Sequence, residues 1–303
     1  MTAMRVATFS LSSQMLQASM AANARMSELQ LQEASGLVSF DYGGLGGKAG
    51  DVIDLETTTA RLTTYSDAAT TAVNRIETAY DAMSSITDLL TNFTSTLSSS
   101  STGSGAETVA SAAESARDEL IALLNTQFNG RYLFAGSNTG NEAVSLDGVS
   151  YDMTTLTTTN SDYYQGNDRT SSVRVSSSEV VDYGLTANQS GLEKALRVLA
   201  SFATVTDATL TDDARETGMD LLTEALDEIL AGQTELSLDA GRLEAAIERN
   251  ENAVSLAGEL LSAATEVDIA EVAVEISSYE TQLEASYAAL AKILGLSLLD
   301  FLS

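Results

Sequence analysis

A long repeat of apolar residues, spaced seven positions apart, most limits what this chain can fold into. Two such seams interleave, so that apolar positions recur at alternating spacings of three and four, and only Thr58 departs from apolar or aromatic character. The first seam contains Leu55, Leu62, Ala69, Ile76, Met83, Leu90 and Leu97, and the second contains Thr58, Tyr65, Ala72, Ala79, Ile86 and Phe93. This spacing predicts one long helix over residues 55–97 with a coiled-coil-like stripe, with Asp51 as its N-cap. Such a helix would span roughly 65 Å and predicts a rod.

The residue types that are missing support this interpretation. The 303 residues contain no Pro, Cys, His or Trp. Pro inside a helix costs about 3 kcal/mol, so its absence is typical of a chain made mostly of long helices. Without Cys or His, the sequence excludes zinc fingers, iron–sulfur clusters, thiol nucleophiles and Ser-His-Asp triads. We expect no catalytic residue, no metal ligand and no cofactor.

Charge narrows the range of partners. The formal net charge is −28, from 15 basic and 43 acidic residues. Such a chain repels phosphate backbones and anionic lipid surfaces, so we expect neither nucleic-acid binding nor a membrane-surface role. No stretch is long and apolar enough to predict membrane insertion, and the first residues are too polar for a cleaved signal peptide.

The first long helix is followed by a break and then by a change of composition. Residues 98–105 form a Ser/Thr/Gly tract, and a second helical stretch then runs to a predicted stop at Asn129-Gly130. From residue 131 to about residue 186, aromatic and β-branched residues lie among Ser, Thr, Asn and Gly. This composition predicts a small β-rich insertion with short strands and turns.

Helical periodicity returns after the insertion. A short amphipathic piece at residues 192–199 precedes a long helix over residues 214–261, in which Gly218, Gly232 and Gly241 are expected to weaken the helix locally. The overall prediction is a mainly α fold, a long antiparallel coiled-coil-like helical rod with paired terminal helices and a small β-rich insertion. The expected parts are residues 1–49 (N-terminal helix and Gly-rich turn), 50–130 (first half of the rod), 131–187 (exposed insertion), 188–262 (second half of the rod) and 263–303 (C-terminal helix).

The two chain ends carry apolar seams that are too short to be stable alone. We therefore expect the ends to pair with each other or with copies from neighbouring chains. Residues 1–34 and 266–303 are expected to be poorly ordered in the dilute monomer and to become helical on assembly. The expected assembly-interface residues are Met15, Ala22, Leu29, Ile269, Val272, Ile276, Tyr279, Leu283, Leu290 and Ile293.

Three patterns resemble chemical motifs but are better explained structurally. The Gly-rich residues 43–50 resemble a phosphate loop, yet the motif needs Gly at Tyr42 and Ser or Thr at Ala49, so a turn between helices is favoured. Acidic pairs such as Glu244/Glu248 are typical of a solvated helix face. The aromatic residues of the insertion, including Tyr163, are expected to form its core.

Several segments also resemble a known family. Residues 129–137, which read NGRYLFAGS, closely resemble a signature at the start of the variable domain of the bacterial flagellin superfamily. The opening at residues 4–9, the turn at residues 33–37, the YQGN at residues 164–167 and the end from residue 279 to residue 302 are similar to that superfamily as well. Within it, the chain is most similar to the hook-associated proteins of the hook–filament junction.

The resemblance implies a structural subunit of the bacterial flagellum, outside the cell, exported by the flagellar type III pathway. It implies a ring of its own copies between a sister hook-associated junction protein and flagellin, with the terminal helices in an inner tube, and an export chaperone. Two alternatives stay open. In the first alternative, the chain is flagellin itself. In the second, which is less favoured, it is a ligand-binding or enzymatic module on a helical stalk.

Overall fold

The fold is mainly helical, as predicted. The computed structural model describes residues 2–100 and 105–302, with side chains at residues 10, 13–100 and 105–292. In these ranges the elements, in chain order, are α1 (Thr2–Ser35), η1 (Tyr42–Lys48), α2 (Ala49–Ser99), α3 (Ala106–Leu124), β1 (Gln127–Phe128), β2 (Arg131–Tyr132), β3 (Ser171–Arg174), β4 (Val180–Tyr183), α4 (Ser190–Phe202), α5 (Asp212–Thr265) and α6 (Ile269–Leu302). None of these helices, within the described residues, is long and apolar enough to cross a membrane.

The chain divides into two compact units. The terminal unit comprises Met1–Ala60 and Val254–Ser303, and the central unit comprises Arg61–Ala253. Helices α2 and α5 each contribute to both units, because each continues through a unit boundary without interruption.

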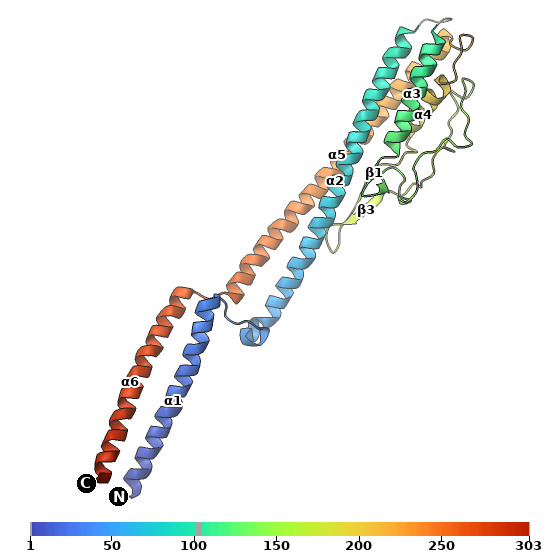
Figure 1. Cartoon of the computed structure of the whole chain (residues 1–303). Helices are drawn as coiled ribbons and strands as arrows, with labels where there is room; N and C mark the ends of the chain where they lie inside the picture. Colours follow the sequence, from blue (N-terminus) through green and yellow to red (C-terminus); the bar gives the residue numbers. More distant parts are fainter. Residues whose placement is uncertain (1, 101–104, 303) are drawn as a thin grey trace. The chain divides into compact units, whose positions relative to one another are not determined.

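The central unit is built on α2 and α5, which lie side by side (Figure 1). The predicted seam of α2 is confirmed from Ala69 onward, and Met83, Leu90 and Leu97 are fully buried. Met83 lies near Gly232 of α5, and Leu97 lies near Gly218, so the two helices run antiparallel. A Cβ atom at Gly218 would lie 2.6 Å from the Phe202 ring. This glycine, expected to weaken the helix, therefore also permits close packing.

Helices α3 and α4 complete the core at one end of the central unit (Figure 1). Every third or fourth residue of α3 is buried, which is the pattern of a helix with one apolar face. Almost all of α4 is buried, and Phe202 packs edge-on against Phe93 of α2 with ring centroids 6.2 Å apart. The short helix predicted at residues 192–199 is confirmed and lies inside the core.

The insertion contains short strands and turns, as predicted. Strands β1 and β2 form one antiparallel pair, and β3 and β4 form another, each in a separate two-stranded sheet. The long stretch between β2 and β3, residues 133–170, consists of turns, bends and irregular segments apart from one isolated bridge. Its frequent Ser, Thr and Asn side chains hydrogen-bond to nearby backbone groups, and these bonds compete with strand pairing. For example, Asn160 Oδ1 accepts a hydrogen bond from Asp162 N at 2.8 Å.

Two predicted helix boundaries were wrong. Helix α3 ends at Leu124, and Asn129-Gly130 forms the two-residue turn of the β1–β2 hairpin instead of a helix stop. Both turn residues have positive φ (51° and 73°), which is the geometry that Asn-Gly favours in hairpins. Helix α2 begins at Ala49, so Asp51 lies in the first turn rather than at the N-cap. There its carboxylate still favours the positive end of the helix dipole.

Candidate assembly surfaces

Helices α1 and α6 of the terminal unit form an antiparallel hairpin (Figure 1). The segments that lead out of α1 and into α6 are joined by backbone hydrogen bonds. Val38 N donates to Thr265 O at 2.7 Å, and Val267 N donates to Gly36 O at 2.9 Å, on either side of a bridge between Leu37 and Glu266. We call these six residues, 36–38 and 265–267, the clasp. It joins the end of α1 to the start of α6 at the base of the hairpin.

Beyond the clasp, the hairpin has a small apolar core. Leu29 of α1 packs with Val272 and Ile276 of α6, and the three side chains are 1%, 6% and 8% exposed. Met26, Val267 and Tyr279 pack around this cluster. The apolar residues of both helices therefore pack along a single seam, because antiparallel helices with the same heptad repeat place their apolar positions opposite each other.

The structure places most of the predicted interface residues along this seam. Five of the ten are buried, namely Ala22, Leu29, Val272, Ile276 and Leu283, and three are half-buried, namely Met15, Tyr279 and Leu290. Ile269, the first residue of α6, is 53% exposed. The side chain of Ile293 lies outside the described residues. The hairpin of one chain thus covers much of the predicted seam.

Polar contacts fix the register of the hairpin. Arg25 pairs with Glu28 at 2.8 Å on its own helix and approaches Glu275 of α6 at 3.9 Å. The hydrogen bond to Glu28 raises the pKa of the Arg25 guanidinium. Asn23 Nδ2 donates to the Tyr287 hydroxyl at 2.8 Å. These contacts are solvent-exposed, so they orient the helices more than they stabilise them.

A second set of apolar residues on the terminal unit remains uncovered, and the sequence analysis missed it. The terminal unit exposes eleven large apolar or aromatic side chains among the described residues, whereas the larger central unit exposes four. The eleven are Leu16, Met20, Leu31, Phe40, Tyr42, Ile53, Leu256, Leu260, Ile269, Val274 and Tyr287. The signal was available, because Leu16, Met20 and Leu31 recur at helical spacing on the α1 face opposite Leu29. An apolar surface this rich is typical of a unit that associates.

The segment that carried the family resemblance, residues 129–137, lies at the root of the insertion. Phe134 and Ala135 are fully buried, while Gly136 has φ 66° and no room for a side chain, since a Cβ would lie 2.1 Å from Asn167 O. Ser137 N donates to Asn167 Oδ1 at 3.1 Å. These residues are constrained by packing and backbone conformation rather than by chemistry.

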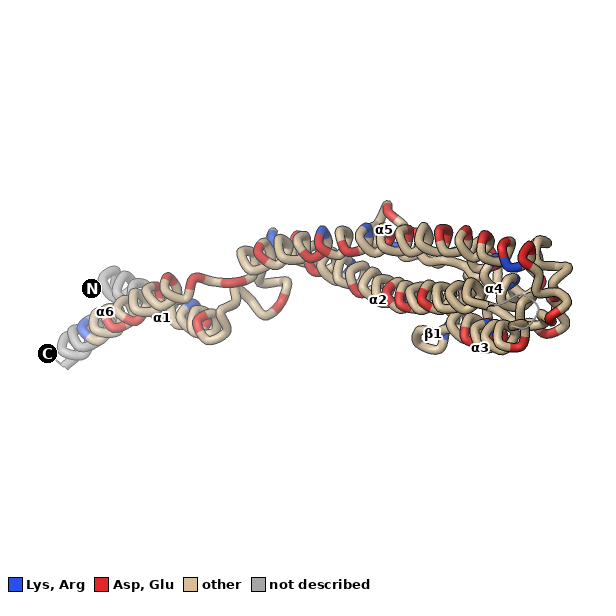
Figure 2. The backbone as a smooth tube through the Cα atoms, turned by 90° about the horizontal axis from the view of Figure 1, so that it is seen from above, with Lys and Arg blue, Asp and Glu red and all other residues tan. Residues whose placement is uncertain are grey.

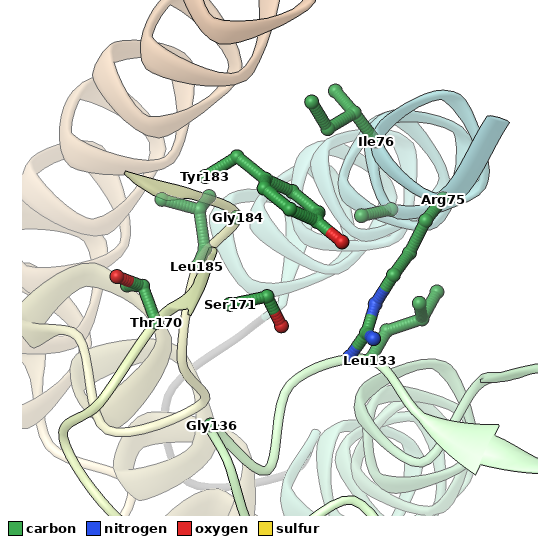
Figure 3. Close-up of a pocket in the computed structure, with 10 residues that line it drawn as sticks. Arg75, Ile76, Leu133, Gly136, Thr170, Ser171, Tyr183, Gly184 and Leu185 are labelled. Carbon is green, nitrogen blue, oxygen red and sulfur yellow. The ribbon is translucent and has the colours of Figure 1, made fainter. Parts of the chain in front are cut away.

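The pocket beside this root is too small for a ligand. It lies between α2, the start of the insertion and the end of β4, with Arg75, Leu133 and Tyr183 among its lining residues (Figure 3). Arg75 donates to Tyr132 O at 3.4 Å, which ties the hairpin to α2. The pocket holds about 10 Å³, which is roughly the room for one water molecule.

The motifs considered for chemistry have structural roles. In the Gly-rich residues 43–50, Asp41 accepts a hydrogen bond from Gly44 N at 2.9 Å, so a carboxylate occupies an amide that a phosphate would need. Glu244 and Glu248 are exposed, as expected of a solvated face, and Tyr163 is buried in the core. Within the described residues, no group of acidic side chains could hold a metal ion.

Paired chain ends, long antiparallel helices and a small inserted module define a class of helical subunits whose two ends fold together. The bacterial flagellin N-terminal helical region matches residues 6–139, and the bacterial flagellin C-terminal helical region matches residues 219–302. Together the two regions cover more than two thirds of the sequence. The chain therefore belongs to the bacterial flagellin family and is a structural component of the flagellum.

One solved structure with a related fold is described as hook-associated. A protein from Vibrio parahaemolyticus, described as a flagellar hook-associated protein, is 18% identical with a TM-score of 0.50, covering 73% of this chain and 99% of that chain. FlgL of Bacillus cereus is 12% identical with a TM-score of 0.38, covering 73% of this chain and 96% of that chain. No curated protein sequence gives a significant match.

Proposed function

We propose that this chain is a hook-associated junction protein, of the kind known as hook-associated protein 3, that connects the flagellar hook to the filament. The observation that carries the assembly role is the terminal unit, whose hairpin has a covered seam and a second, exposed apolar surface. The junction role is supported by the fold that the chain shares with the Vibrio protein described as hook-associated, over 99% of that protein's length.

In this proposal the hairpin ends of neighbouring copies pack side by side into a ring. A sister hook-associated junction protein lies on one side of the ring and flagellin on the other. The protein reaches this extracellular site by flagellar type III export, with a chaperone that covers the ends before export and without a cleaved signal peptide. The domain boundaries expected from the sequence give the parts their roles, with residues 1–49 and 263–303 in an inner tube and residues 131–187 exposed.

Charge substitutions in the hairpin seam test the assembly role. We expect Ile276→Asp and Leu283→Asp to abolish incorporation into flagella while the central unit stays folded, because an unpaired charge in a packed seam costs several kcal/mol. Incorporation would be scored by electron microscopy and motility, and folding by circular dichroism. The matched control is Ser278→Asp, at an exposed position of the same helix. Normal incorporation of both seam variants would refute the role of the hairpin.

Order in the ends can be followed at the same time. We expect the ends to be cut by protease in the dilute monomer and protected after assembly, because the hairpin core is small and its second apolar surface is uncovered. Full protection of both ends in a verified monomer would contradict this part of the proposal.

Flagellin itself is the second candidate, and the family regions that match are named for flagellin. A filament-forming subunit polymerises with its own copies without limit, whereas a junction protein requires the sister ring beneath it. Purified protein added to filament or hook seeds and viewed by electron microscopy separates the two. Filaments that extend without limit would replace the junction role with that of flagellin.

A further inference from the structure

Helix α1 carries apolar side chains on two opposite faces. One face, with Leu29 and Ala22, is buried against α6. On the other face, Leu16, Met20 and Leu31 are 50%, 65% and 60% exposed. A helix with apolar residues on both sides is typical of a position between two partners, and α6 supplies only one of them.

The charge of α1 also sets it apart. Among its 34 residues it has two basic residues, Arg5 and Arg25, and two acidic residues, Glu28 and Glu33, so its side chains sum to zero net charge. The chain as a whole carries −28, and acidic residues are spread along α2 and α5 (Figure 2). Because its side chains sum to zero charge, α1 can approach an acidic surface of another copy without net repulsion.

A groove of suitable character lies on the same unit. It is lined by Lys48 from the end of η1, by Asp51, Asp54, Leu55 and Thr58 from the start of α2, and by Leu260, Ala263 and Ala264 from the end of α5. Its volume is about 540 Å³, and Leu260 is 51% exposed. The α5 wall is apolar, whereas the opposite wall carries Leu55 beside charged and polar residues. Because the groove holds Asp51, Asp54 and Lys48, its lining has a net charge of −1. This is the form of site in which an amphipathic helix is held.

We propose that this groove binds the exposed face of α1, centred on Met20, from a second copy of the chain. The inference rests on the assembly role proposed above and names one contact within it. The apolar face of α1 matches Leu55 and the apolar α5 wall of the groove. The zero net charge of α1 avoids the repulsion that the slightly acidic lining would exert on the acidic helices α5 and α6.

The same chain's α1 does not supply this face. The clasp hydrogen bonds hold residues 36–38 against residues 265–267, and Leu29 is packed on Val272 and Ile276 of α6. Turning α1 back into its own groove would break both. The contact is therefore between different surfaces of two copies, a heterologous contact, which generates a ring or a helical array when repeated.

Cysteine cross-linking tests the contact directly, because the natural sequence contains no Cys. Full-length Met20→Cys protein is mixed with full-length Leu260→Cys protein, assembled on seeds and oxidised. Leu16→Cys and Leu31→Cys are tested alongside to cover the register. The control is Val274→Cys, on α6 of the same hairpin and 71% exposed. We expect at least about tenfold more cross-linked heterodimer with the α1 variants, because disulfides form only when Cα atoms are within about 7 Å.

The other outcomes overturn the proposal in different ways. Assembled particles without a link between α1 and Leu260→Cys would remove this contact and leave the assembly role standing. A link within one chain of a Met20→Cys/Leu260→Cys variant in dilute monomer would show that α1 fills its own groove. No association of any kind would overturn both this inference and the proposed function.

A charge variant provides a second readout that does not depend on disulfide geometry. Met20→Glu should leave the monomer folded, since the side chain is 65% exposed, but should reduce assembly at least tenfold. Gln14→Glu adds the same charge at an exposed position of α1 away from the face of Leu16, Met20 and Leu31, and is the control. Equal assembly of the two variants would contradict the proposed contact.

Discussion

The central and terminal units are built from the same kind of helix yet differ in how they bury apolar surface. In the central unit, large side chains such as Leu90, Leu120 and Phe134 are completely buried in one continuous cluster. In the terminal unit, the buried residues of the hairpin cluster are Leu29, Val272 and Ile276, and side chains such as Met20 and Val274 remain exposed. Within a single chain, the central unit therefore buries its large apolar side chains, whereas the terminal unit leaves many of its own exposed.

The largest effect should come from breaking the buried ion pair of the central unit. Glu193 and Arg197 of α4 are 4% and 3% exposed and pair at 2.9 Å. Glu193 accepts from Asn160 N at 3.0 Å, and Arg197 donates to Leu156 O, so the pair holds a loop of the insertion. Glu193→Leu leaves Arg197 buried without its partner and should lower the free energy of unfolding by about 3–5 kcal/mol.

Denaturant unfolding measures this change. The matched control is Glu224→Leu, which removes an exposed partner of Lys194 and should change stability by less than about 1 kcal/mol. Equal effects of the two substitutions would show that the buried pair does not hold the loop.

The next prediction compares the central cluster and the hairpin cluster by truncating one buried side chain of each to alanine. Leu90→Ala should destabilise the central unit by about 2–5 kcal/mol, because a cavity replaces a fully buried side chain. Ile276→Ala should leave the main thermal transition unchanged, because Ile276 belongs to the separate hairpin cluster. Scanning calorimetry on the monomer distinguishes the two, and a comparable fall in both transitions would show that the units unfold together.

A smaller effect is expected at the root of the insertion. Gly136→Ala places a Cβ at 2.1 Å from Asn167 O in a backbone conformation with φ 66°. We expect the free energy of unfolding to fall by about 1–3 kcal/mol because of backbone strain and crowding. Gly140→Ala, where a Cβ meets nothing within 4 Å, is the control and should unfold as the wild type does.

The smallest expected effect is on folding stability at alkaline pH. Burial raises the pKa of Tyr151 to about 12, and its hydroxyl has no hydrogen-bond partner among the described residues. Burial also raises the pKa of Tyr163. Because the folded pKa lies above the ordinary value of 10, the stabilisation is complete below pH 10 and is lost as the pH rises toward about 12.

Tyr151→Phe removes one of these titrating groups and should reduce the alkaline loss of stability, with little cost at neutral pH because no hydrogen bond is removed. Unfolding curves at pH 8 and pH 11 measure the difference. An unchanged pH dependence in the variant would show that Tyr151 does not contribute.

The sequence predicted the elements whose patterns are local. The heptad seam of α2, the break after residue 99 and the last helix from Ile269 follow from apolar spacing and turn-forming residues alone. The errors also have local causes. Asn-Gly serves as a helix stop or as a hairpin turn, and only the pairing of Gln127 with Tyr132 decided between them.

The candidate site was predicted in part. The seam of Leu29, Ile276 and Leu283 was visible because it repeats every seven residues. The second face of α1 and the groove beside Leu260 were missed, since a groove depends on two helices, α2 and α5, that are about 200 residues apart in sequence.

The sequence by itself determined that this protein would be mainly helical, with apolar seams along the helices at both ends. Helical periodicity and the absence of Cys, His and Pro are properties of neighbouring residues and of composition, so they need no tertiary information. Only the tertiary structure decided which apolar residues are covered. The clasp directs Leu29 toward α6 and leaves Met20 exposed, because burial depends on which segments meet in space rather than on the residues themselves.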